Sequence, residues 1–130
     1  MKILIDASVL MAVIINEPPK ARVIALTKGA EILSPAMLPY EIGNALSRLC
    51  KRRILTAAEA IKGFQIYRAV SLRLLDVNFE KALAIAGQFA IYAYDAYYLE
   101  IATRLRLPLL TFDERMKSVG KELELEILEV

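Results

Sequence analysis

Four acidic residues stand in four separate stretches of the chain, each where a strand is expected to end or a helix to begin. They are Asp6, Glu41, Asp95 and Asp113. In a parallel sheet flanked by helices, such positions meet at the edge formed by the carboxyl ends of the strands. Carboxylates gathered there would repel one another unless a cation compensated. Oxygen donors suit Mg²⁺ or Mn²⁺, ions that commonly activate a water for phosphodiester hydrolysis.

Each carboxylate taken alone has an ordinary structural explanation. Asp6 follows a short apolar run and is of a residue type that often caps a helix. Glu41 and Asp95 fall in the first turns of expected helices, where the helix dipole favours a negative charge. Asp113 lies inside a T-x-x-E pattern with capping-box spacing and could be only a first-turn acid. The conjunction of all four, rather than any one of them, predicts a site.

The composition narrows the chemistry open to this chain. It has no His and a single Cys, which exclude imidazole acid–base catalysis, His-ligated zinc, an internal disulfide and multi-cysteine metal sites. The 17 basic and 15 acidic residues give a net charge of +2, too small to argue nucleic-acid binding from bulk charge. Catalysis must therefore rest on carboxylates, lysines, hydroxyls or a bound metal.

The length and hydropathy of the chain predict one domain over residues 1–130. Hydrophobic residues make up 57% of the sequence, which is ample for a buried core. The sequence contains no evident linker, internal repeat or low-complexity segment. It also lacks an evident signal peptide and an uncharged apolar run long enough to span a membrane. We therefore expect a cytoplasmic protein with no membrane partner.

Strands and helices are expected to alternate along the chain. Apolar runs and turn signals predict strands over residues 2–5, 31–34, 70–77, 108–111 and 123–130. Helical spacing and capping signals predict helices over residues 8–15, 20–28, 35–53, 57–68, 78–90, 94–105 and 112–119. This order indicates an α/β fold, a single α/β/α domain with a parallel central sheet and helices on both faces.

Three local features refine these helix and strand predictions. Pro39 means that the regular part of the third helix begins near Leu38, or that its first turn is distorted. Glu41, Asn44 and Arg48 follow one another at three- and four-residue steps and should share one edge of that helix. Glutamates alternate with apolar residues near the end of the chain, so the last strand should be an edge strand with one wet face.

Four short motifs occur in order over essentially the whole chain and resemble those of the PIN-domain nucleases. They are residues 5–8 (IDAS), 41–46 (EIGNAL), 94–99 (YDAYYL) and 111–113 (TFD). Each motif is weak alone, whereas their order and the length of the chain are together specific. Within the PIN-domain nucleases, the chain is similar to the VapC toxins of toxin–antitoxin pairs.

This resemblance implies a PIN-like fold and a Mg²⁺- or Mn²⁺-dependent endoribonuclease. It assigns metal binding and catalysis to the four carboxylates named above. Ser8, Asn44 and Thr111 match positions that support them. The reaction would be in-line attack of a metal-activated water on an RNA phosphodiester. The resemblance also implies a VapB-type antitoxin that covers the active site, and a homodimer.

Two other functions stay open. The chain could be a housekeeping RNA-processing nuclease, which the absence of a neighbouring gene for a small DNA-binding protein would favour. It could also be a non-catalytic interaction module. The apolar residues over 9–15 are typical of a core, but they are too many for one buried helix face, so some could line a partner surface. The tyrosines at positions 92, 94, 97 and 98 could pack in the core, form dimer contacts or stack on bases. Core packing is favoured, because Tyr97 and Tyr98 are adjacent and cannot point the same way. The basic residues over 48–53 are expected on a solvated helical face, with an RNA backbone path as the minority interpretation.

Overall fold

The computed structural model describes residues 1–130 and contains one four-stranded parallel sheet. Its strands are β1 (Lys2–Ile5), β2 (Glu31–Pro35), β3 (Arg73–Leu75) and β4 (Leu109–Leu110). The strand order is β3-β2-β1-β4, and the register pairs Leu4 of β1 with Leu33 of β2 and with Leu109 of β4. Because every pairing is parallel, all four strands end at the same edge of the sheet.

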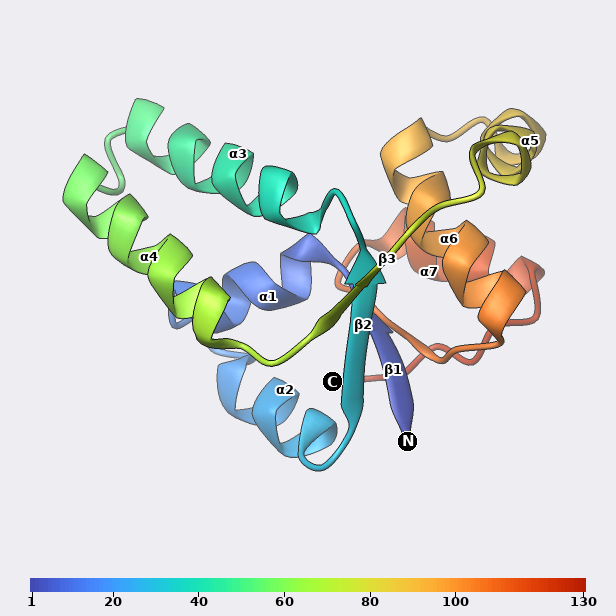
Figure 1. The fold of residues 1–130 in the computed structure, drawn as a ribbon, viewed down its shortest axis with the longest axis horizontal. Helices are drawn as coiled ribbons and strands as arrows, with labels where there is room; N and C mark the ends of the chain where they lie inside the picture. Colours follow the sequence, from blue (N-terminus) through green and yellow to red (C-terminus); the bar gives the residue numbers. More distant parts are fainter.

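Seven helices connect and follow the strands. They are α1 (Ala7–Ile14), α2 (Lys20–Thr27), α3 (Leu38–Lys51), α4 (Ala57–Ala69), α5 (Phe79–Phe89), α6 (Ala93–Leu105) and α7 (Glu114–Glu122). Figure 1 shows α1 to α4 on one side of the sheet and α5 to α7 on the other. None of the seven has the length and apolar character needed to cross a membrane.

Strand residues alternate between two apolar layers. Ile3 and Ile5 of β1 pack in one buried cluster with Ile42 of α3, whereas Leu4 packs in a second cluster with Leu99 of α6. Successive side chains of a strand point to opposite faces, so an unbroken apolar run suits a strand that is covered on both sides. The predicted α/β/α architecture with a parallel sheet is confirmed.

Local signals set the starts of two helices as expected. The Thr56 hydroxyl accepts from the Glu59 backbone N–H at 3.1 Å, and the Glu59 carboxylate accepts from the Thr56 N–H at 2.9 Å, which completes the predicted capping box of α4. Helix α3 begins at Leu38 with Pro39 in its first turn. A proline is tolerated there because the first backbone N–H groups of a helix have no partner within it.

Two strand predictions are wrong in extent. The strand expected over 70–77 is limited to the three residues of β3, which pairs only with β2 and lies at the edge of the sheet. The strand expected over 123–130 is a single bridge between Ile127 and Leu109. Helix α7 extends to Glu122 and the chain then turns through Glu124 at φ 63°, which leaves little length for pairing. The predicted outward face of glutamates is nevertheless exposed.

Most apolar residues of α1 belong to the core, the interpretation that the sequence favoured over a partner surface. Five of its residues are buried: Val9, Leu10, Met11, Ala12 and Ile14. Val13 is partly buried against the same core cluster. The helix packs against α3 and α4 as well as α2, so apolar residues on more than one of its faces are covered.

An ion pair between the buried carboxylate of Glu100 and the exposed Arg104 joins α6 to the segment between β3 and α5. The Glu100 side chain is 1% exposed, and Arg104 donates to its two carboxylate oxygens at 2.7 and 3.3 Å. The same guanidinium donates to the backbone carbonyl of Asp76 at 3.0 Å. Removal of one partner from a buried pair costs far more than exchange of both, because it leaves an uncompensated charge.

We expect Arg104→Met to lower the free energy of unfolding by about 3 kcal/mol. The double variant Glu100→Gln/Arg104→Met should regain most of that loss, because no unpaired charge stays buried. Arg73→Met is the matched control: its pair with Glu31 is exposed, so its effect should stay within about 0.5 kcal/mol. Urea unfolding measures all three variants, and equal losses for Arg104→Met and Arg73→Met would contradict this account.

Candidate active site

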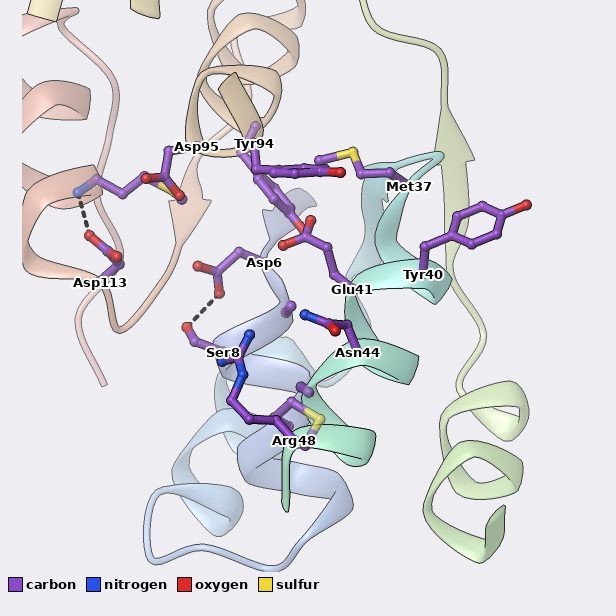
Figure 2. Close-up of a pocket in the computed structure, with 15 residues that line it drawn as sticks. Asp6, Ser8, Met37, Tyr40, Glu41, Asn44, Arg48, Tyr94, Asp95 and Asp113 are labelled. Carbon is purple, nitrogen blue, oxygen red and sulfur yellow. Dashed lines mark hydrogen bonds between the residues drawn. The ribbon is translucent and has the colours of Figure 1, made fainter. Parts of the chain in front are cut away.

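A cavity of about 630 Å³ opens at the carboxyl ends of the strands, and all four predicted carboxylates line it. Ser8 and Asn44 of the predicted supporting set line it as well (Figure 2). Thr111 is not among the lining residues, but it is buried and its hydroxyl donates to Asp6. The structure therefore brings together all seven residues singled out from the sequence, as the parallel topology requires.

The Asp6 carboxylate caps α1 and also faces the cavity. It is 4% exposed and accepts hydrogen bonds from the Val9 N–H at 3.2 Å, the Ser8 hydroxyl at 2.7 Å and the Thr111 hydroxyl at 2.5 Å. Burial raises the pKa of this carboxyl by more than the three hydrogen bonds lower it, and the charge of Asp113 raises the pKa further. The cap and the cavity-lining position thus belong to the same residue.

Glu41 enters the cavity from the first turns of α3. Its Oε1 accepts a hydrogen bond of 2.8 Å from the hydroxyl of Tyr98, a residue of α6 that is 1% exposed. Burial holds the pKa of the Tyr98 hydroxyl far above its ordinary value, so this group is a neutral donor. Burial also raises the pKa of Glu41, the Tyr98 hydrogen bond lowers it, and the charges of Asp6 and Asp95 raise it.

The sequence placed Tyr98 in the core but missed its contact with Glu41. The ring is buried, as predicted, and only the hydroxyl reaches the site. One signal could have indicated the contact. Tyr98 follows Asp95 by three residues on the same helix, and residues at that spacing share a face.

Asp95 lies in the first turn of α6, whose N-cap is Tyr92. Burial raises the pKa of Asp95, and the charges of Asp113 and Asp6 raise it further. No hydrogen bond within the chain lowers it. Asp95 is therefore the only one of the four carboxylates whose ionised form accepts no hydrogen bond from the chain.

Asp113 is the N-cap of α7, not a first-turn acid. Its Oδ1 accepts from the Met116 N–H at 2.8 Å, and the helix begins at Glu114. The capping box expected between Thr111 and Glu114 is absent. The Thr111 hydroxyl instead donates to Asp6 and accepts from the Asp113 N–H at 3.0 Å, because the buried Asp6 carboxylate is the stronger acceptor.

The raised pKa values of Asp6, Glu41 and Asp95 have a direct consequence for stability. Between the ordinary carboxyl pKa and the raised value, the folded chain binds more protons than the unfolded chain. The free energy of unfolding therefore falls as the pH rises through this window. At neutral pH the clustered charges destabilise the metal-free fold, and either the loss of one charge or the gain of a cation relieves that cost.

One cation of the chain itself lines the cavity. Arg48 extends from α3 into the space beside Ser8 (Figure 2), and it forms no ion pair within the chain. Glu41, Asn44 and Arg48 all reach the cavity, so their predicted common edge on the helix is confirmed. The expectation that this arginine lies on a solvated face is incomplete, because its exposed side chain also borders the carboxylates.

The chemistry of the carboxylates fits a hard divalent cation. The donors are oxygens, the lining includes no thiol or imidazole, and three of the four carboxyls have pKa values raised in part by their neighbours. No three of them are grouped closely enough to form a ready-made three-ligand site. Mg²⁺ usually keeps several waters and takes only one or two carboxylates, so the arrangement suits an ion held largely through water.

Comparisons with known proteins agree with this site and fold. The sequence model of the PIN domain matches residues 3–122. Ribonuclease VapC9 of Mycobacterium tuberculosis is 30% identical over 121 residues, which cover 92% of this chain and 91% of the relative. Ribonuclease VapC3 of Pyrobaculum aerophilum is 25% identical over 121 residues, which cover 89% and 92% of the two chains.

A solved structure, PAE2754 from Pyrobaculum aerophilum, superimposes with a TM-score of 0.71 at 25% identity and covers 95% of this chain and 96% of its own. VapBC2 from Rickettsia felis, solved with a DNA fragment from its promoter, gives a TM-score of 0.67 at 16% identity, with 99% and 98% covered, and shows the shared fold. From the matched domain and the 30% identity over nearly the whole length, the chain belongs to the PIN-domain family, among its VapC ribonucleases.

Proposed function

We propose that this chain is a Mg²⁺- or Mn²⁺-dependent endoribonuclease whose active site is the carboxylate cavity. The observation that carries the proposal is the convergence of four carboxylates from four separate segments, Asp6, Glu41, Asp95 and Asp113, on one cavity. Structural caps alone would not need to share a cavity or to raise one another's pKa values. The names of the relatives support RNA as the substrate.

The residues of the carboxylate cavity have different roles in the proposed reaction. A bound Mg²⁺ or Mn²⁺ would supply a Lewis acid that lowers the pKa of a water and stabilises charge on the phosphate. The four carboxylates would hold the cation largely through its bound waters, and Ser8 and Thr111 fix the orientation of Asp6 through their hydroxyls. Tyr98 holds Glu41 in the same way. Asn44 lies on the same wall as Glu41 and is placed to orient the RNA or a water.

Arg48 supplies the positive charge that RNA requires beside an acidic site. A phosphodiester that approaches the carboxylates is repelled until a cation compensates, and a guanidinium pairs well with phosphate oxygens. Arg48 is exposed at the cavity wall and free of other ion pairs, so it can contact a backbone phosphate without breaking an interaction of the fold.

Asp95→Asn tests the proposal most cleanly, because this carboxylate caps nothing. Cleavage of a mixed RNA substrate with Mg²⁺ or Mn²⁺ should fall by about two orders of magnitude or more, and excess chelator should abolish wild-type cleavage without unfolding. The melting temperature without metal should not fall, because a repulsive charge is lost. Glu59→Gln, the capping-box acid of α4, is the control and should reverse the pattern: slightly lower melting and unchanged cleavage.

Full cleavage in chelator, or Asp95→Asn protein that melts lower and cuts at the wild-type rate, would show that the carboxylates serve only the fold. Asp6→Asn is a less clean test. The loss of one of the three hydrogen bonds accepted by Asp6 should lower stability as well as activity.

We further propose that the chain is the toxin of a type II toxin–antitoxin pair, with a VapB-type antitoxin as its partner in the cytoplasm. The relatives named VapC support this over a housekeeping RNA-processing nuclease. Helix α1 cannot supply the docking surface, but α2 and α4 expose isoleucines that can: Ile24, Ile61 and Ile66. The homodimer implied by the resemblance stays a prediction, which sedimentation of the purified chain addresses.

Co-expression with the product of the neighbouring small gene should yield a stable complex in which RNA cleavage is suppressed. Ile61→Glu should weaken that complex by about tenfold or more, because a charge would be buried against an apolar partner, while the free variant cuts RNA normally. Ser71→Glu, at an exposed position between α4 and β3, is a control for the added charge. Co-purification without inhibition would favour the interaction module, and no neighbouring gene would favour the housekeeping nuclease.

A further inference from the structure

A second cavity, of about 290 Å³, adjoins the carboxylate cavity. Met37 and Tyr40 line both, so the two cavities lie next to each other at the start of α3. Figure 2 shows Met37 beside the Tyr94 ring and Tyr40 directed away from Asp6. The second cavity is mainly apolar, and its remaining walls include Phe79 and Tyr97.

Aromatic rings lead from the carboxylates to this second cavity. Tyr94, in the wall of the carboxylate cavity, meets the Tyr97 ring edge to face at 5.7 Å between centroids. Tyr97 in turn meets Phe79 at 5.4 Å with an interplanar angle of 88°. Tyr40 is 80% exposed, Tyr94 59% and Phe79 57%. Core packing, the expectation from the sequence for Tyr94, does not account for its exposure, and Tyr40 and Phe79 likewise keep much of their surface in water.

A nucleobase has the shape and the chemistry to cover these rings. Base–aromatic stacking stabilises single-stranded RNA on proteins and requires a π-face that is open to solvent. Tyr97 is held between Tyr94 and Phe79, so these three rings lose little side-chain entropy on stacking. An RNA whose phosphodiester lies at the carboxylates would have its neighbouring nucleotide within reach of the adjoining cavity.

The only charged residue in the second cavity is Asp76. Its backbone carbonyl accepts from Arg104, but its carboxylate has no hydrogen bond or ion pair within the chain. A carboxylate presents two adjacent acceptors and no donor. Guanine is the base whose Watson–Crick edge presents two adjacent N–H donors, so the two edges match.

We propose that the second cavity is a nucleobase subsite that selects guanine in the nucleotide next to the scissile phosphodiester. The base stacks on the exposed face of Phe79, Tyr97 and Tyr40 border it, and Asp76 accepts from its Watson–Crick edge. The proposal rests on the ribonuclease function proposed above and adds a sequence preference to it. A second copy of this chain, seated on the same rings, is the competing occupant that the experiment below distinguishes.

The test uses oligouridine substrates that carry one guanosine, or one abasic nucleotide at the same position, cut with Mg²⁺ or Mn²⁺. The wild type should cut at a fixed distance from the guanosine, and kcat/KM should fall by about 5- to 100-fold when the base is removed. Phe79→Ala should lower kcat/KM for the guanosine substrate by a similar factor and leave the abasic substrate unchanged. Asp76→Asn should reduce the preference for guanosine over adenosine without slowing the abasic substrate.

Tyr92→Ala is the matched control, because Tyr92 is 86% exposed and lines neither cavity. It should behave as the wild type on both substrates. A second readout avoids cleavage altogether: guanosine titrated into the metal-free chain should shift the ring NMR signals of Phe79 and Tyr97 more than uridine does.

Four results would overturn the subsite. Phe79→Ala and base removal could lower kcat/KM independently, so that their effects multiply. Phe79→Ala could slow every substrate equally and convert a sedimenting dimer to a monomer, which would assign the rings to a second copy of the chain. The wild type could cut no RNA at all, which would remove the ribonuclease function and the subsite with it. Cleavage that ignores guanosine would remove the subsite alone.

Discussion

The buried carboxylate of Asp6 ties the two ends of the chain together at the site. Asp6 directly follows β1 and caps α1, and its carboxylate accepts a hydrogen bond from the hydroxyl of Thr111, which lies 105 residues further along the sequence. The Ser8 hydroxyl extends this link, since it donates to Asp6 and accepts from the Phe112 N–H at 3.2 Å. The start of α1 and the turn between β4 and α7 are therefore held in one register, and the positions of the other cavity residues depend on it.

Four helices begin at this cavity, and each brings one carboxylate. Asp6 and Asp113 are the N-caps of α1 and α7, and Glu41 and Asp95 lie in the first turns of α3 and α6. The positive ends of four helix dipoles partly offset the mutual repulsion of the acids. A helix cap and a cation ligand are therefore compatible roles here, and the same placement that explains each acid separately also gathers the acids in one site.

The sequence was sufficient for the features that depend on local signals. Apolar periodicity indicated the layered α/β/α fold, and the residues that begin helices marked the four acids that line the cavity. Contacts between distant segments could not be predicted from the sequence. No local signal indicates that the Tyr98 hydroxyl donates to Glu41, which lies 57 residues away in the sequence. Likewise, the T-x-x-E pattern does not indicate that the Thr111 hydroxyl donates to Asp6 and forms no capping box with Glu114. The missing final strand likewise depends on where α7 ends.

We propose that these four carboxylates form a cation site, and their crowding contributes to the raised pKa values of Asp6, Glu41 and Asp95. Calorimetric titration of Mn²⁺ into the metal-free chain at about pH 7.5 and about pH 5 tests it directly. The wild type should bind saturably and more weakly at the lower pH, because protons compete for the same oxygens, and Asp95→Asn should bind about tenfold more weakly or worse. Glu59→Gln should match the wild type. Equal affinity of the wild type and Asp95→Asn at both pH values, or no binding by either, would contradict the account.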